Sequence, residues 1–207
     1  GFGCLATLAG IIGLYEFYNI VGKNGFSPFR ISGIVTGVWL FVAYWLSVRK
    51  NFSVDYHFLR QEIFLVLIFW LLLIQAFRRG TKDAVKNISV TIFGILYIFF
   101  LLSFSVTLRY LPNGVCILIM VLLVSKFGDI GGYLLGRKYG KHKLAKVISP
   151  NKTIEGACFS LLFSVLIAVI FSLIPAIRVF SLKWSIVFGI IVGFSALFGD
   201  LADSLLK

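Results

Sequence analysis

The sequence predicts an all-α integral membrane protein, a polytopic helical bundle with about seven spans. Of its 207 residues, 59% are hydrophobic and only 14% are charged, and the mean hydropathy is +0.99. A soluble domain is nearer half apolar and about a quarter charged. Apolar runs of about 20 residues, the length that a helix needs to span a bilayer, recur along the chain. The ~10-residue alternating segments of a transmembrane β-barrel do not occur. We therefore expect one transmembrane helical domain over residues 1–207.

The spans follow from the apolar runs in chain order, and loops that contain Lys and Arg separate them. Their ends are set to within a few residues. The chain begins inside an apolar run and ends on what reads as a continuing helix, so we expect a fragment of a longer protein, cut at both ends. The expected spans are about 3–21, 31–48, 62–78, 88–108, 114–136, 154–174 and 183–206.

The loop cations predict which ends of the spans face the cytoplasm, because short cytoplasmic loops are enriched in Lys and Arg. With seven spans the loops alternate between two faces, with twelve loop cations on one face and six on the other. We expect the first face to be cytoplasmic. The net charge of +12 then favours anionic lipid headgroups or phosphate substrates, and not nucleic acid, as partners. The twelve are Lys23, Arg30, Arg78, Arg79, Lys82, Lys86, Arg137, Lys138, Lys141, Lys143, Lys146 and Lys152.

Four carboxylates lie inside the predicted spans. A charge there costs about 3 kcal/mol on insertion scales and marks a functional site by default. Glu16 lies on the first span, Asp129 on the fifth, and Asp200 and Asp203 on the seventh. In the predicted orientation the last three lie toward the cytoplasmic face. They therefore converge with the basic loop 137–152.

The spacing of the last carboxylates indicates a divalent-cation site. Asp200, Asp203 and Lys207 are spaced i, i+3, i+7, and Ser204 joins them at i+4, so all four share one helical face. Carboxylates a turn apart, with Asp129 from another helix, suit Mg²⁺, which completes its coordination with substrate phosphates. We expect these three carboxylates to bind Mg²⁺, and a second cation is an open alternative. Ion pairing within helices is the competing interpretation, and it leaves the basic loop unexplained. Its pairs would be Asp129 with Lys126 and Asp203 with Lys207.

The segment S-P-N-K-T-I-E-G, Ser149 to Gly156, contains a helix-start signal. Ser149 suits an N-cap with Pro150 in the first turn, and Thr153 is a second candidate cap. A helix N-terminus binds phosphate through free N–H groups and its dipole, and Lys152 adds a positive charge. The plainer alternative is a well-capped helix beside cytoplasmic cations.

Four glycines crowd the end of the fifth span. They indicate either close packing of helices through small residues or close approach of backbone to a bulky ligand, and both can hold. Together these features predict a membrane-embedded site for a divalent metal and phosphates. Such a site suits phosphoryl or nucleotidyl transfer to or from a lipid. The glycines are Gly128, Gly131, Gly132 and Gly136.

Three ordered motifs resemble those of the phosphatidate cytidylyltransferase (CDP-diacylglycerol synthase) family. D-I-G-G-Y-L-L-G-R-K-Y-G-K-H-K-L, from Asp129, resembles the family's D-x-G-A-Y-x-x-G-R-x-F-G-K-H-K-L. S-P-N-K-T-I-E-G resembles S-P-K-K-T-x-E-G, and G-D-L-A-D-S-L-L-K, from Gly199, resembles the opening of G-D-x-x-E-S-x-x-K-R. The first span's Y-E-F-Y resembles the family's early acidic-aromatic helix. Departures are Gly132 for Ala, Asn151 for Lys and Asp203 for Glu, and the family signature continues beyond Lys207.

The resemblance implies that phosphatidic acid and CTP react to give CDP-diacylglycerol and pyrophosphate, with Mg²⁺ offsetting the charge of the triphosphate. It also implies membrane lipids as neighbours and a homodimer as a candidate assembly. Two alternatives stay open, a CTP-dependent polyprenol or dolichol kinase, and an ion or solute transporter with an acidic intramembrane site. A membrane scaffold in which the carboxylates only pack is the plainest alternative.

The residue roles that the resemblance implies fall into two groups. The catalytic group is Asp129, Lys152, Asp200, Asp203 and Lys207, and its three aspartates are the predicted metal ligands. The substrate-binding group is Arg137, Lys141, Ser149, Thr153 and Ser204.

Overall fold

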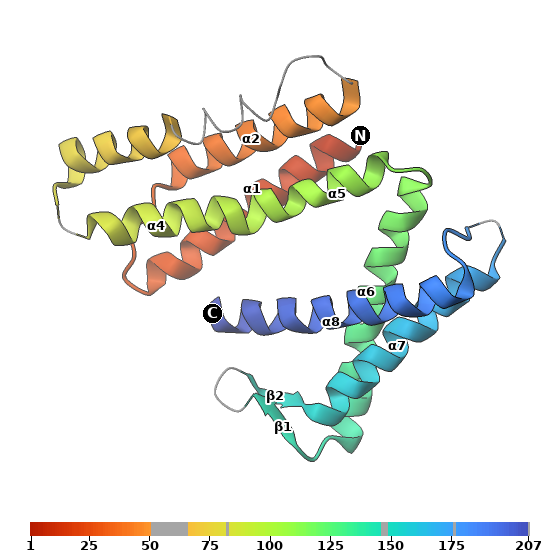
Figure 1. Cartoon of the computed structure of the whole chain (residues 1–207). Coiled ribbons are helices and arrows are strands. Elements are labelled where there is room, and N and C mark those ends of the chain that lie inside the picture. The colour runs from red at the N-terminus through yellow and green to blue at the C-terminus, as the bar shows by residue number, and fades with distance from the viewer. Residues whose placement is uncertain (51–65, 82, 146–148, 176, 207) are drawn as a thin grey trace. The chain divides into compact units, whose positions relative to one another are not determined.

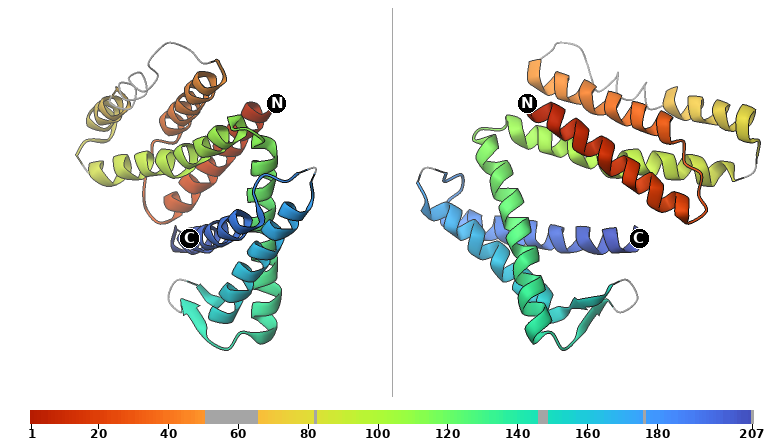
Figure 2. Two further views of the ribbon diagram at one scale, coloured as in Figure 1. Left: turned by 45° about the vertical axis from the view of Figure 1, so that its right-hand side comes forward. Right: turned by 180° about the vertical axis from the view of Figure 1, so that it is seen from behind.

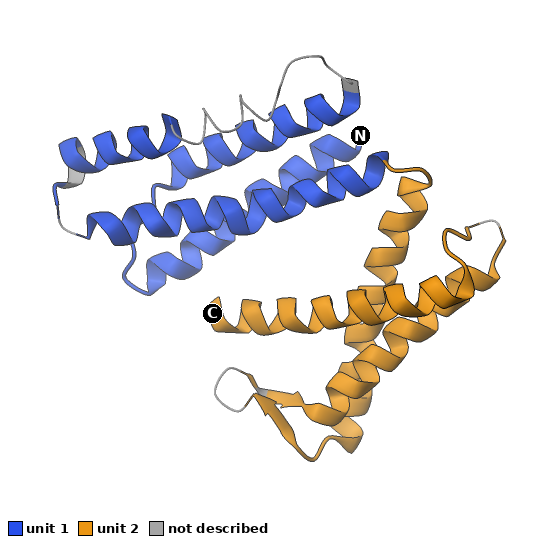
Figure 3. Ribbon diagram, viewed as in Figure 1, with its two compact units in different colours: residues 1–110 blue, residues 111–207 orange. Residues whose placement is uncertain are grey.

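The structure, a computed structural model, describes residues 1–207 apart from 51–65, 82, 146–148, 176 and 207. It divides into two compact units, residues 1–110 and residues 111–207 (Figure 3). Helices dominate both units, and one short hairpin of strands lies in the second (Figure 1). The expectation of one transmembrane domain stays a prediction.

The expected polytopic membrane bundle is confirmed. Within the described residues, six helices are long and apolar enough to cross a membrane, and they match six of the seven expected spans. The remaining span, expected over 62–78, begins outside the described residues, and its described part is a shorter apolar helix, Val66–Phe77. Many large apolar side chains on the long helices are exposed, as is expected of surfaces that face lipid. The six are Phe2–Lys23, Arg30–Arg49, Ala84–Tyr110, Gly114–Tyr139, Ile154–Leu173 and Leu182–Leu206.

Unit 1 is a helical layer held together by buried aromatic side chains and a few polar contacts. The fully buried Tyr18 donates its hydroxyl to the carbonyl of Thr91 at 2.9 Å, and the Thr91 hydroxyl accepts from the amide of Phe29 at 2.9 Å. These bonds tie both the first helix and the loop after it to the helix that contains Thr91. The elements are α1 (Phe2–Lys23), α2 (Arg30–Lys50), η1 (Gln75–Arg79), α4 (Ala84–Ile95), η2 (Leu96–Phe100) and α5 (Leu101–Tyr110), and the last three run on as one span.

Unit 2 consists of three long helices and a hairpin. In both views of Figure 2, α6 and α7 pack along each other and α8 crosses them. At one end of the unit an apolar core forms around Met120, Val124, Ala168 and Phe171. The hairpin lies at the other end, where α6 finishes and α7 starts. The elements are α6 (Gly114–Tyr139), β1 (Lys143–Ala145), β2 (Ser149–Thr153), α7 (Ile154–Leu173) and α8 (Leu182–Leu206).

Small residues let α6 and α7 approach closely. A Cβ added at Gly136 would lie 2.8 Å from the Cα of Gly156, and one added at Gly132 would lie 2.9 Å from the carbonyl oxygen of Gly156. The Ser164 hydroxyl crosses the contact and donates to the carbonyl of Val124 at 3.2 Å. The packing interpretation of the glycines therefore holds along this seam. Its members recur at every fourth residue, Gly128, Gly132 and Gly136 on α6 and Gly156, Ser160 and Ser164 on α7.

The helix start predicted at Ser149 is wrong, and the alternative cap is the one used. Residues Ser149–Thr153 form β2, which pairs antiparallel with β1 and places Lys143 opposite Thr153. Helix α7 begins at Ile154, and the Thr153 hydroxyl accepts from the amide of Gly156 at 3.1 Å. Strand pairing gives this backbone hydrogen-bond partners that the first turn of a helix lacks. The N-cap of α7 is therefore Thr153, the last hydroxyl residue before the apolar run.

Candidate functional site

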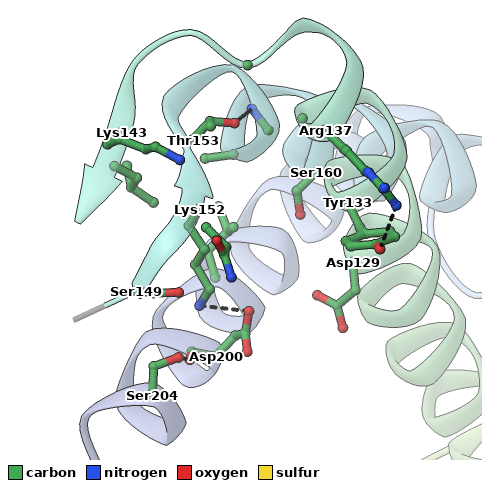
Figure 4. A pocket seen from close by; sticks show the side chains of 18 residues that line it. Asp129, Tyr133, Arg137, Lys143, Ser149, Lys152, Thr153, Ser160, Asp200 and Ser204 are labelled. Carbon is green, nitrogen blue, oxygen red and sulfur yellow. Dashed lines mark hydrogen bonds and ion pairs between the residues drawn. The ribbon is translucent and has the colours of Figure 1, made fainter. Parts of the chain in front are cut away.

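A cavity of about 640 Å³ lies at the hairpin end of unit 2. Its walls come from α6, the hairpin, the start of α7 and the last turns of α8 (Figure 4). The volume is in the range usual for small-molecule sites. The charged side chains that line it are Asp129, Arg137, Lys143, Lys152 and Asp200.

An ion pair closes one side of the cavity. The Lys152 Nζ of β2 lies 2.7 Å from the Asp200 Oδ2 of α8. The Lys152 side chain is 20% exposed and the Asp200 side chain 59% exposed, so the lysine is the more enclosed partner. The pair therefore joins the motif around Ser149 to the motif around Asp200.

Asp129 faces the same hollow from α6, across from that pair (Figure 4). Its carboxylate is close enough to interact electrostatically with Lys126, Asp200 and Lys152. Among the described residues it forms no ion pair, and so the predicted alternative pairing with Lys126 is not made. Two carboxylates from different helices are thus directed into one cavity.

Most of the predicted site residues are brought together in this cavity, but not all of them. Lys141 and Asp203 do not line it. Lys207 lies outside the described residues, and Glu16 is exposed on α1 of the other unit. The predicted residues that line the cavity are Asp129, Arg137, Ser149, Lys152, Thr153, Asp200 and Ser204.

Comparison with known proteins identifies the family. The model of the cytidylyltransferase family matches residues 1–207. The chain belongs to the cytidylyltransferase family. The expectation of an enzyme from this family, and not a transporter or a packing scaffold, is thereby confirmed.

Named relatives agree with this assignment. The chain is 30% identical to a phosphatidate cytidylyltransferase of Chlamydia muridarum over 223 residues, which is 99% of this chain and 71% of the relative. It is 30% identical to the enzyme of the same name from Chlamydia pneumoniae over 226 residues, 99% of this chain and 70% of that one. The Staphylococcus aureus enzyme of that name is 28% identical over 210 residues, 96% of this chain and 73% of that one.

The donor set of this family member fits a hard divalent cation. The described part of the chain holds no group of three or more His, Cys, Asp or Glu side chains arranged around a metal position. Mg²⁺ is usually bound by one or two carboxylates together with substrate phosphates and water. Asp129 and Asp200 are the two carboxylates of the cavity that would hold such a cation. Beside them, the Ser204 hydroxyl donates to the Asp200 carbonyl at 2.8 Å, so it fixes its own turn of α8.

The hairpin is anchored to the start of α7. The amide of His142 donates to both oxygens of Glu155 at 3.2 and 3.3 Å, and His142 Nδ1 lies 2.7 Å from Glu155 Oε1. The amide of Ile154 donates to the His142 carbonyl at 2.9 Å. The wall of the cavity formed by β1 and β2 is therefore fixed to the helix that follows it.

Sequence reasoning missed four polar residues of the cavity, Tyr133, Lys143, Asn151 and Ser160. Ser160 is 3% exposed and belongs to the small-residue face of α7, a spacing that the sequence displays. The Tyr133 hydroxyl accepts a long hydrogen bond of 3.5 Å from Arg137, one helical turn along. Only the strand pairing distinguishes Lys143 from the neighbouring loop lysines.

Proposed function

We propose that this chain transfers the cytidylyl group of CTP to phosphatidic acid, which forms CDP-diacylglycerol and pyrophosphate. The family assignment and the names of the relatives support a reaction of this type. The observation on which the proposal chiefly rests is the cavity, where side chains of all three motifs meet. The ion pair between Lys152 and Asp200 links two of those motifs directly.

In the proposed reaction a phosphate oxygen of phosphatidic acid attacks the α-phosphorus of CTP. A new phosphorus–oxygen bond forms, the bond from the α-phosphorus to the oxygen that bridges to the β-phosphorus breaks, and pyrophosphate leaves with that electron pair. Both substrates are anions, so the site has to lower their mutual repulsion and align them. Lys152 and Arg137 would neutralise phosphate charge from two sides of the cavity.

The hydroxyls and the helix start orient the substrate. Thr153 caps α7 by accepting from the amide of Gly156, and Thr153 also lines the cavity, where its hydroxyl hydrogen can be donated to a phosphate. Ser149, on the same strand as Lys152, lines the wall beside it. We propose that these groups position the triphosphate by hydrogen bonds, while Ser204 holds the turn that presents Asp200.

Asp129 and Asp200 would bind Mg²⁺ directly. Asp203, a turn further along α8 and outside the cavity lining, would act through a metal-bound water. When bound, the cation would offset negative charge on the triphosphate and on the departing pyrophosphate. Lys207 stays a predicted phosphate-binding residue, and so does Lys141.

The proposed location is the cytoplasmic side of a bacterial inner membrane. The excess of loop cations on the face that includes the hairpin supports this orientation. Cytoplasmic CTP would then reach the cavity directly, while phosphatidic acid would come from the membrane. A homodimer stays a prediction.

The test uses the full-length protein purified in detergent, with Mg²⁺, phosphatidic acid, and CTP labelled at either the α- or the γ-phosphate. Transfer of the α-label, and not of the γ-label, into a lipid extract is the expected result. Transfer of the γ-label into an added polyprenol would instead establish the kinase alternative. If well-folded protein transfers neither label, the proposed function is wrong.

Matched variants test the site itself. Asp129→Asn and Asp200→Asn each remove one carboxylate of the cavity and are expected to abolish most of the transfer. Asp83→Asn is the control, because its exposed carboxylate pairs with Lys86 in unit 1 at 3.2 Å. Equal activity in all three variants would contradict the assignment of the cavity.

A further inference from the structure

The cavity is lined by a lysine with no assigned role. Lys143 lies on β1 and lines the cavity, whereas Lys141, two residues earlier, does not. Both belong to the same basic stretch and look equivalent in the sequence. The fold therefore distinguishes two lysines that composition and spacing treat alike.

The position of Lys143 is fixed from both sides by backbone contacts. Strand pairing places it opposite Thr153, the cap of α7. The residue before it, His142, is held through its amide by Glu155 and through its carbonyl by the amide of Ile154. The Lys143 backbone is thus tied to the same helix start that we propose positions the triphosphate.

The charge of Lys143, unlike that of Lys152 on the paired strand, is not neutralised by a carboxylate. Lys152 is paired with Asp200, whereas in the described part of the chain Lys143 has no carboxylate partner. Figure 4 shows both side chains extending from the hairpin on the same side of the cavity, with Arg137 on the far side. A cation without a counter-ion at the wall of a cavity suits an anionic ligand.

We propose that Lys143 binds the polyphosphate of the nucleotide together with Lys152, so that the hairpin holds a nucleoside triphosphate by two lysines from paired strands. A triphosphate has anionic oxygens spread over three phosphorus atoms, so it can engage both lysines and the start of α7 at once. Arg137, on α6 at the far side of the cavity, is the cation left for the phosphate of the lipid. The proposal rests on the proposed function for the identity of the nucleotide, and on the cavity alone for the binding of a polyphosphate.

The test compares Lys143→Met with Lys138→Met in the full-length protein, because Lys138 is exposed at the end of α6, does not line the cavity and has no proposed role. Both variants remove one positive charge from the same stretch and keep a long side chain. Binding of CTP and of pyrophosphate is measured by calorimetry with Mg²⁺ and without phosphatidic acid. Loss of one charge-assisted hydrogen bond is expected to raise both dissociation constants about tenfold or more in Lys143→Met. In Lys138→Met we expect a change of no more than about twofold, the size of a weak long-range charge effect.

Kinetics and rescue separate binding from a structural role. Lys143→Met should raise the KM for CTP and leave the KM for phosphatidic acid and the thermal unfolding midpoint unchanged. Lys143→Arg should recover most of the affinity, because it restores the charge.

Three outcomes would overturn the proposal. These are unchanged polyphosphate binding in Lys143→Met, equal losses in the two lysine variants, and an effect confined to phosphatidic acid. If the wild-type protein binds pyrophosphate but transfers no cytidylyl group, the proposed function fails while the calorimetry still decides the role of Lys143.

Discussion

The ammonium group of Lys152 lies 2.7 Å from the carboxylate of Asp200, and this contact joins β2 to α8 across one wall of the cavity. In the proposed function one partner binds phosphate and the other binds the metal. We expect the pair to open when substrate enters, with Lys152 moving from the carboxylate to a phosphate. Nucleotide and metal should therefore promote each other's binding.

Replacing Lys152 by Met tests this coupling. The lysine competes with a divalent cation for Asp200, so Lys152→Met should bind Mn²⁺ alone about two- to fivefold more tightly, as expected for a partly exposed ion pair. The same variant should bind CTP more weakly, since a phosphate partner is lost. Bound Mn²⁺ can be counted by electron paramagnetic resonance, with Lys138→Met as the control. An unchanged or weaker affinity for Mn²⁺ would show that the pair does not restrain the metal site.

The two aspartates of α8 should differ in importance. Asp200 lines the cavity and Asp203 does not. We expect Asp200→Asn to lower kcat/KM by about 100-fold or more, the usual cost of losing one electrostatic group at a reacting centre. Asp203→Asn should cost much less, because it acts through water. Cytidylyl transfer from labelled CTP measures both variants, and the reverse order of effects would place Asp203 nearer the chemistry.

The seam between α6 and α7 should not tolerate a methyl group. In Gly136→Ala the new Cβ would lie 2.8 Å from the Cα of Gly156, an atom that cannot move aside without shifting the helix. We expect a loss of about 1–3 kcal/mol in unfolding free energy, the usual range for overpacking. Gly199→Ala is the control, since a Cβ there meets nothing within 4 Å. Thermal unfolding in detergent compares the two, and equal stability would refute close contact at this seam.

Glu155 should hold the hairpin in place. Its carboxylate accepts from the His142 amide and contacts the His142 ring. In Glu155→Ala the amide loses its partner, so hydrogen exchange there should rise about tenfold, as expected for one lost hydrogen bond. Exchange at amides in the middle of α7 should stay unchanged. If exchange at His142 does not rise, Glu155 has no anchoring role.

The fold could be predicted from the sequence wherever long apolar runs determine it. Six of the expected spans appear as helices, because a run of about 20 apolar residues has few other ways to satisfy its backbone in a membrane. The hairpin could not be predicted. Strands β1 and β2 are 3 and 5 residues long, and their pairing depends on contacts between residues separated along the chain.

The candidate site was predictable to a similar degree. Asp129 and Asp200 could be identified, since a carboxylate in an apolar run is conspicuous wherever it lies. The sequence did not show which of Lys141 and Lys143 lines the cavity. That depends on the strand pairing that places Lys143 opposite Thr153. The helix start at Thr153 was ambiguous for the same reason: Ser149 is an equally good cap until its backbone pairs with β1.

The seam of glycine and serine between α6 and α7 also limits where substrate and product can enter and leave the cavity. Where backbone atoms of two helices touch, no gap is left through which an acyl chain or a nucleotide could pass, and the helices cannot slide without collision. Substrate and product therefore cannot exchange through this seam, and the side of the cavity that the hairpin and α8 border remains a route for them. The ion pair between Lys152 and Asp200 stands on that side, so the same two side chains that bind the reactants would also have to part to release the product.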